Sequence, residues 1–205
     1  MIRFIAVAVL FWTIWAGALF AQSPENILVI EIEGQANGRV EIELLPDVAP
    51  EHVARIKRLA REGYYNNIAF HRVIGGFMAQ TGDVKFGKRE TFLPRYAGQG
   101  GSIYPDLRAE FSDLSFQTGV VGMARGQDED SANSQFFITL GDASFLDGAY
   151  TIFGRVIEGM NVVSNIKFNE TIQEIRAASQ AGRQHANGAV GTPDFMTRVF
   201  VKADE

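Results

Sequence analysis

The chain has 205 residues, of which 46% are hydrophobic and 21% charged, a composition typical of one globular domain. Its formal net charge is −5, so we do not expect it to bind nucleic acid through counterion release. It contains no cysteine, which excludes disulfide bonds and argues against a structural zinc site.

The N-terminal segment has the layout of a secretory signal peptide. One arginine precedes an apolar run, Phe4–Phe20, and small residues follow up to Ala21. We expect residues 1–21 to be cleaved off, leaving Gln22 first and the protein periplasmic or secreted. Cleavage after Ala18 also fits. An uncleaved membrane anchor is the alternative, because about 17 apolar residues is the lower limit for spanning a bilayer.

Residues 22–26 are expected to form a short linker, and one domain is expected to run from residue 27 to residue 205. Ile27–Glu33 and Val40–Leu44 each alternate between apolar and charged residues, with Asn37-Gly38 between them. This pattern predicts an antiparallel hairpin with one face exposed to water.

A helix is predicted to begin at Pro50, since proline is favoured at the first helical position, and to end at Gly63. Val53, Ile56 and Ala60 would form its buried stripe. His52 lies among charged residues, and we expect it at the surface.

Short β segments separated by glycine-rich loops occupy most of the remaining chain. They are Ala69–Ile74, Gly119–Met123, Gln135–Thr139, Thr151–Val156 and Met196–Lys202. Many short strands with few helices indicate a mainly β fold, closed or nearly closed into a barrel.

Two further helices are predicted between the last two of these strands. Met160, Val163 and Ile166 give a short one. Residues 171–181 give another, in which Thr171 and Glu174 match a capping box. Residues 182–193 read as a polar loop.

The chemistry-bearing segment is Phe70–Asp83. It places Arg72 among large apolar residues, with Gln80 eight positions later. An arginine in such surroundings is costly to bury unpaired, which favours a functional role. A guanidinium in an apolar, amide-lined pocket suits the binding and polarisation of a peptide better than it suits hydrolysis. Phe136 and Phe137 are adjacent on a strand, so one should pack in the core and the other line a pocket.

Other motifs carry weaker signals. Residues 98–101 are glycine-rich but lack the Lys-Ser/Thr of a phosphate-binding loop, so we expect a surface loop near a groove. Residues 128–130 are acidic but lack the remainder of a calcium loop. The three histidines show no metal-ligand spacing. We therefore expect no metal and no cofactor.

From Ile27 to Val201 the chain resembles the cyclophilin family of peptidyl-prolyl cis–trans isomerases. The motifs that carry the resemblance are Phe70-His71-Arg72-Val73-Ile74, Gly76-Phe77-Met78, Gly82-Asp83, Gly100-Gly101, Met123-Ala124-Arg125, Ser134-Gln135-Phe136-Phe137-Ile138, Phe145-Leu146-Asp147-Gly148 and Phe153-Gly154. The family fold that the resemblance implies is a closed eight-stranded antiparallel β-barrel capped by two helices.

The resemblance also implies roles for individual residues. Arg72 matches the catalytic arginine, Gln80 the amide that holds it, and Phe77 the wall of the proline pocket. The positions that match substrate-binding residues are Met78, Phe137 and Leu146 in the pocket, Ala124, Arg125 and Gln135 along the rim, and Phe145 and Tyr150 farther along the groove.

Five positions depart from the best-known eukaryotic pattern, and Met123-Ala124-Arg125 followed by residues 130–138 (DSANSQFFI) resembles the bacterial branch of the family. Gly75 replaces a proline, Thr81 a glycine and Phe145 a tryptophan; Arg125 and Tyr150 stand where asparagine and histidine are usual. Because the tryptophan supports cyclosporin binding in the family, sensitivity to that drug is left open.

The expected function is acceleration of Xaa-Pro bond rotation during the folding of exported proteins. The expected partners are proline-containing polypeptides, with no nucleic acid, a membrane only if the signal segment is uncleaved, and a monomeric state. A proline-peptide-binding module or chaperone with little turnover is the alternative, and a barrel with an inactive pocket is a third reading. The segment 171–193 has no assigned role.

Overall fold

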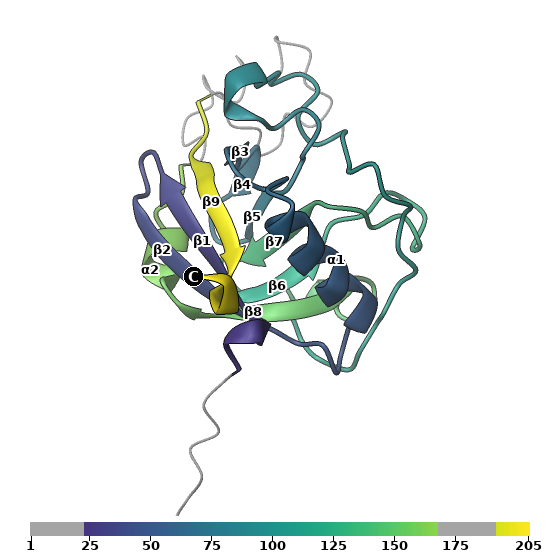
Figure 1. Cartoon of the computed structure of the whole chain (residues 1–205). Coiled ribbons are helices and arrows are strands. Elements are labelled where there is room, and N and C mark those ends of the chain that lie inside the picture. Colours follow the sequence, from purple (N-terminus) through teal and green to yellow (C-terminus); the bar gives the residue numbers. More distant parts are fainter. Residues whose placement is uncertain (1–22, 168–191) are drawn as a thin grey trace, which may run out of the picture.

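The computed structural model describes residues 23–167 and 192–205, and in them one antiparallel sheet curls around a core (Figure 1). The strands are β1 (Ile27–Glu33), β2 (Gly38–Leu44), β3 (Ile68–Ala69), β4 (Arg72–Ile74), β5 (Met78–Thr81), β6 (Val120–Met123), β7 (Phe136–Thr139), β8 (Ile152–Glu158) and β9 (Phe195–Val201). Their order in the sheet is β3-β9-β1-β2-β8-β6-β7-β5-β4.

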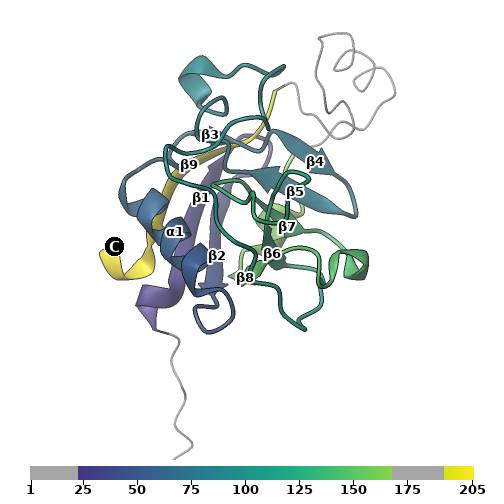
Figure 2. The same ribbon diagram turned by 90° about the vertical axis from the view of Figure 1, so that its right-hand side faces the viewer.

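Within residues 23–167 and 192–205, two α-helices and four short 3₁₀ turns accompany the sheet. They are α1 (Pro50–Arg61), α2 (Met160–Val163), η1 (Pro24–Asn26), η2 (Arg89–Thr91), η3 (Ser144–Leu146) and η4 (Lys202–Asp204). Helix α1 packs against β9 and α2 against β2. A quarter turn of the view shows α1 and β9 on one side of the molecule, with β4 and β5 on the other (Figure 2). Among the described residues, no helix is both long and apolar enough to cross a bilayer.

The two strands at the ends of the sheet are neighbours in sequence. β3 pairs with β9 and β4 pairs with β5, and only Phe70 and His71 separate them. The segment predicted as a single strand, Ala69–Ile74, is therefore broken into two, because the backbone N–H of Phe70 donates to the carbonyl of Asp194 and not to β5. The predicted mainly β, barrel-like fold is confirmed, but the described part of the chain contains nine strands where eight were expected.

The barrel interior holds the main hydrophobic core. Strands β1 and β2 contribute Leu28, Ile30, Val40 and Ile42, and α1 contributes its predicted stripe. The expectation that His52 lies at the surface is wrong: its side chain is fully buried, and its Nδ1 lies 2.6 Å from Oε2 of Glu110. The sequence gives no sign of this pairing because the two residues are 58 positions apart.

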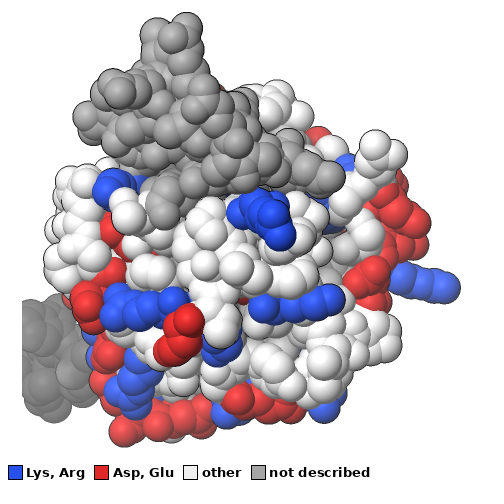
Figure 3. Space-filling view, turned by 90° about the horizontal axis from the view of Figure 1, so that it is seen from above, with Lys and Arg blue, Asp and Glu red and all other residues white. Residues whose placement is uncertain are grey.

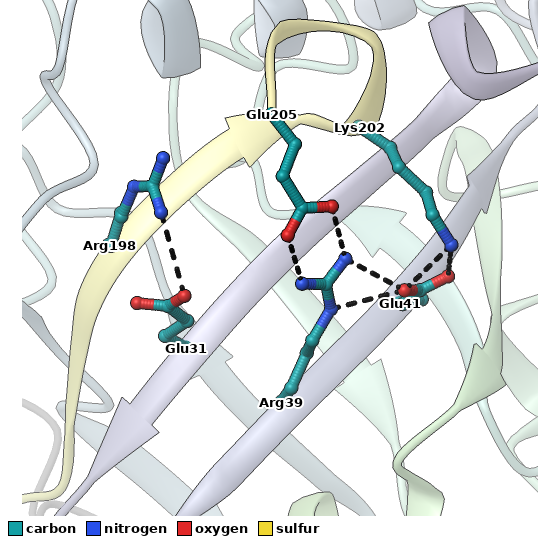
Figure 4. A network of polar contacts seen from close by, with 6 residues as sticks. All are labelled: Glu31, Arg39, Glu41, Arg198, Lys202 and Glu205. Carbon is teal, nitrogen blue, oxygen red and sulfur yellow. Dashed lines mark hydrogen bonds and ion pairs between the residues drawn. The ribbon is translucent and has the colours of Figure 1, made fainter.

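A polar network joins β2 to the C-terminal turn η4 on the outside of the barrel, and a separate ion pair joins β1 to β9 (Figure 4). Arg39 donates to both carboxylate oxygens of Glu205, at 2.6 and 2.9 Å, and Lys202 donates to Glu41 at 2.7 and 2.9 Å. Lys202 lowers the pKa of Glu41, which is nearly buried. The network holds the C-terminal turn η4 against the sheet, where it also contacts η1.

Three expectations fall wholly or partly outside the described residues. The signal segment 1–21 and the predicted helix 171–181 do so entirely, and the predicted loop 182–193 does so except for its last two residues. The short helix predicted around Met160–Ile166 is present as α2, ending at Val163.

Candidate active site

The candidate site lies on the outer face of the sheet, where β4, β5, β7 and β6 run side by side. Arg72 faces Gln80 across β4 and β5, Gln80 faces Phe137 across β5 and β7, and Phe137 faces Gly122 across β7 and β6. Side chains alternate along a strand, so the neighbouring row points inward and joins the core. Strand register therefore places the predicted arginine, amide and phenylalanine in one row.

A chain of side-chain hydrogen bonds holds Arg72. Its Nη1 donates to Oε1 of Gln80 at 3.2 Å, and Nε2 of Gln80 donates to Oε1 of Gln135 at 3.0 Å. Gln135 in turn donates to the carbonyl of Gly100 at 2.7 Å. Because each amide uses its oxygen as acceptor and its nitrogen as donor, the guanidinium is linked through two side chains to the backbone of a loop.

A second hydrophobic cluster, outside the barrel, underlies the pocket. Its buried part consists of Met78, Phe116, Phe137, Ala143 and Ile152, and the residues packed against it include Phe77, Ala124, Leu146 and Tyr150. The rings of Phe116 and Phe137 stack at 5.5 Å, and a Cβ at Gly122 would meet both rings. Glycine at this position is thus what allows Phe137 to lie flat beneath the pocket.

The cavity above this cluster has a volume of about 280 Å³. Nine of the predicted site residues line it: Arg72, Phe77, Met78, Gln80, Ala124, Arg125, Phe137, Leu146 and Tyr150. Arg72 is half-buried in its wall, and burial lowers the pKa of this arginine. The arrangement places a cation and an amide beside an apolar hollow that can receive a small ring.

The remaining two predicted residues lie just beyond this cavity. Gln135 lines an adjoining hollow of about 610 Å³, which shares Gln80, Ala124 and Arg125 with the first. Phe145 is 71% exposed and meets the ring of Phe77 at 5.3 Å, so it extends the apolar rim outward.

Arg125 is fixed along the rim by backbone carbonyls. Its Nε and Nη2 both donate to Ala149 at 3.0 Å, and its Nη1 donates to Gly126 and Gln127. Its guanidinium also lies over the ring of Tyr150, 4.7 Å from the centroid. Arginine and tyrosine at these two positions thus form one stacked unit.

Sequence reasoning missed one wall of the cavity. His71, Pro94, Arg95, Ala97 and Gly98 line it, and all but His71 lie on the loop that follows η2. The loop is folded back by buried Asp83, whose carboxylate accepts the backbone N–H groups of Lys85, Phe86, Gly98 and Gly100. The glycine-rich run at residues 98–101 was the one available signal.

His71 is buried between this loop and the cavity. Its ring nitrogens make no hydrogen bond of good geometry to a described residue. Burial lowers its pKa to about 4, against the opposing effect of nearby Asp83. The ring is thus neutral at physiological pH and acts as packing beside Arg72.

The described residues include no group of three or more His, Cys, Asp or Glu side chains placed to hold a metal ion.

Comparison with known proteins agrees with this geometry. The family model described as "Cyclophilin type peptidyl-prolyl cis-trans isomerase/CLD" matches residues 27–183. The chain belongs to the cyclophilin family. It is a peptidyl-prolyl cis–trans isomerase.

Two relatives of this cyclophilin show how far the likeness extends. A "Probable peptidyl-prolyl cis-trans isomerase" of Brucella suis is 50% identical over 185 residues, covering 90% of this chain and 86% of the relative. Peptidyl-prolyl cis-trans isomerase B of Bacillus subtilis is 34% identical over 139 residues, covering 67% of this chain and 90% of the relative.

Solved cyclophilins share the fold. A cyclophilin from Hirschia baltica superposes with a TM-score of 0.68 at 24% identity, covering 89% of this chain and 76% of that one. A Cryptosporidium parvum cyclophilin, solved in the presence of the dipeptide Ala-Pro, gives a TM-score of 0.65 at 25% identity, covering 85% and 98%.

Proposed function

We propose that Arg72 is the catalytic residue of this isomerase and that Xaa-Pro segments of polypeptides bind in the cavity beside it. The observation that carries the proposal is the half-buried guanidinium of Arg72, hydrogen-bonded to Gln80 at the wall of an apolar hollow. The Cryptosporidium relative solved with Ala-Pro supports a proline-containing ligand.

Rotation about a peptide bond meets a barrier of about 18–20 kcal/mol because amide resonance must be broken. In the twisted state the prolyl nitrogen gains a free lone pair. A donor aimed at that nitrogen binds the twisted state better than either planar state, which is differential transition-state binding. The guanidinium of Arg72 is charged and rigid, and the apolar wall strengthens its interaction by excluding water.

The other predicted residues bind different parts of the peptide. Phe77, Met78, Phe137 and Leu146 anchor the proline ring while the preceding residue turns. Ala124, Arg125 and Gln135 bind the backbone along the rim, and Phe145 and Tyr150 contact residues farther along the groove. Gln80 positions Arg72. No metal, cofactor or covalent intermediate is needed for this rotation.

We further propose that the protein acts as a monomer on proteins exported with it. The support is the N-terminal signal layout, with cleavage after Ala21. Cell fractionation with mass spectrometry of the intact protein tests this: a periplasmic or secreted chain beginning at Gln22 is expected. A chain that retains residues 1–21 in the membrane fraction would contradict cleavage.

A proline-binding module with little turnover is the second candidate, because the same cavity could hold a peptide without turning it. Refolding of a client whose slow phase is proline-limited separates the two. The isomerase shortens the slow phase at substoichiometric concentration, whereas a binder acts only when stoichiometric and leaves the rate constant unchanged or lower.

A further inference from the structure

The proline cavity holds more positive charge than one catalytic arginine supplies. Arg95 joins Arg72 and Arg125 in its lining, and the described lining residues include no aspartate or glutamate. The chain as a whole has a net charge of −5, so this excess is local. On the face that carries η2, lysines and arginines stand among mostly uncharged residues, and most acidic side chains lie toward the margins (Figure 3).

Arg95 is presented by an ordered turn. The backbone N–H groups of Tyr96 and Ala97 both donate to the carbonyl of Leu93, at 2.9 and 3.0 Å. The side chain of Gln99 donates to the carbonyl of Arg95 itself at 3.0 Å. Asp83 fixes the far end of the loop through Gly98 and Gly100, and the ring of Tyr96 packs on Phe86 at 5.5 Å.

The guanidinium of Arg95 is not engaged by a carboxylate of the described chain. None of the ion pairs among described residues includes it, and its one described contact is the face of Tyr96, at 4.6 Å. The guanidinium of Arg125, by contrast, donates its hydrogen bonds to backbone carbonyls. Of these two rim arginines, Arg95 is the one whose donors are open to a ligand.

We propose that Arg95 is a specificity residue that selects substrates with an acidic side chain directly next to the proline. The cavity is only about 280 Å³, so a carboxylate that reaches Arg95 while the ring occupies the apolar end belongs to the residue just before or just after the proline. A carboxylate matches the fork of a guanidinium and can accept two hydrogen bonds from it. This inference rests on the proposed proline site.

The test is isomer exchange, measured by NMR, of two peptide pairs blocked at both ends so that the side chain is the one variable charge. One pair is Ala-Glu-Pro-Ala against Ala-Gln-Pro-Ala, and the other Ala-Pro-Glu-Ala against Ala-Pro-Gln-Ala. In at least one pair we expect kcat/KM to be about 1.5-fold to fivefold higher for the Glu peptide than for the Gln peptide, the range of an exposed charge pair. The ratio should fall in 1 M salt, where the Debye length is about 3 Å.

Arg95→Gln should bring that ratio to one, and a circular dichroism spectrum and a urea unfolding midpoint that match those of the wild type would show that the variant is folded. The matched control is Arg89→Gln, on η2 just before this loop, where the arginine pairs with Glu33 and lies outside the cavity lining; it should keep the preference. A ratio of one in both wild-type pairs, or a preference that survives in Arg95→Gln, would overturn the inference. Absence of acceleration on every peptide would instead overturn the proposed isomerase site.

Discussion

At the residue scale, the amide of Gln80 uses both of its ends. Its oxygen accepts from Arg72 and its nitrogen donates to Gln135, which is itself bonded to Gly100. Replacing it removes the restraint on the guanidinium without removing the charge. We expect Gln80→Leu to lower kcat for an Ala-Pro peptide by about tenfold, or roughly 1.4 kcal/mol, with a smaller change in KM.

Gln117→Leu is the control for this change, since the side chain of Gln117 is exposed, hydrogen-bonds among the described residues only to neighbouring Ser115 and lies outside the cavity lining. Equal kcat values for the two variants would contradict a positioning role for Gln80.

At the scale of one element, the N-terminus of α1 is capped from a distance. The helix begins at Pro50 after Ala49, which has no capping side chain. The carboxylate of Glu110 accepts instead from the N–H groups of Glu51 and His52, at 3.2 and 3.1 Å, and lies beside the buried ring of His52. We expect Glu110→Ala to lower the free energy of unfolding by about 2–3 kcal/mol in urea titration, because two N–H groups and a buried ring nitrogen lose their partner.

Glu51→Ala provides the comparison, since its exposed side chain acts on the same helix end only through the dipole. It should cost less than about 1 kcal/mol. Similar losses for Glu51→Ala and Glu110→Ala would rule out capping by Glu110.

How far the sequence predicts this molecule depends on how local each feature is. The hairpin of Ile27–Glu33 with Val40–Leu44 and the helix start at Pro50 depend on neighbouring residues, and both are found as predicted. The expectation that one face of the hairpin is exposed to water is wrong for most of β1, because Ile27 and Val29 pack with Phe200. Phe136 and Phe137 separate into core and pocket, as strand geometry requires. The break between β3 and β4, by contrast, requires Asp194, far along the chain.

The features that sequence reasoning missed depend on distant partners. Burial of His52 requires Glu110. The placement of Arg95 in the cavity requires Asp83 to fold the intervening loop. The other predicted cavity residues were found because they stand within motifs that match the family. The loop that carries Arg95 matches no such motif apart from its glycines.

At the scale of the whole molecule, stability should depend on pH through His71. Burial lowers its folded pKa to about 4, whereas an unfolded histidine titrates near about 6.5. Between these two pKa values the unfolded chain binds more protons than the folded chain. The contribution of His71 to the free energy of unfolding is therefore fully present above pH about 6.5 and decreases as the pH falls toward 4. We expect urea titrations to show a loss of about 2 kcal/mol between pH 6.5 and 4.5.

His71→Gln should flatten the profile in this window. The carboxylates with lowered pKa values, such as Glu25, Glu41 and Asp204, lose their contributions only at lower pH. A wild-type profile that is already flat from pH 6.5 to 4.5, or an unchanged slope in the variant, would show that His71 is not the group responsible.

The most direct test of the account is the exchange rate of a blocked Ala-Pro peptide between its isomers, measured by NMR with the wild type, Arg72→Lys and Arg72→Ala. Arg155→Ala serves as the control, since that arginine pairs with Glu43 away from the cavity. We predict that Arg72→Ala lowers kcat/KM by about 10²–10³-fold, the usual cost of removing a transition-state donor. Arg72→Lys should retain more of the wild-type kcat/KM than Arg72→Ala but not all of it, because lysine keeps the positive charge and lacks the rigid guanidinium. Wild-type rates in a folded Arg72→Ala protein would contradict catalysis by this guanidinium.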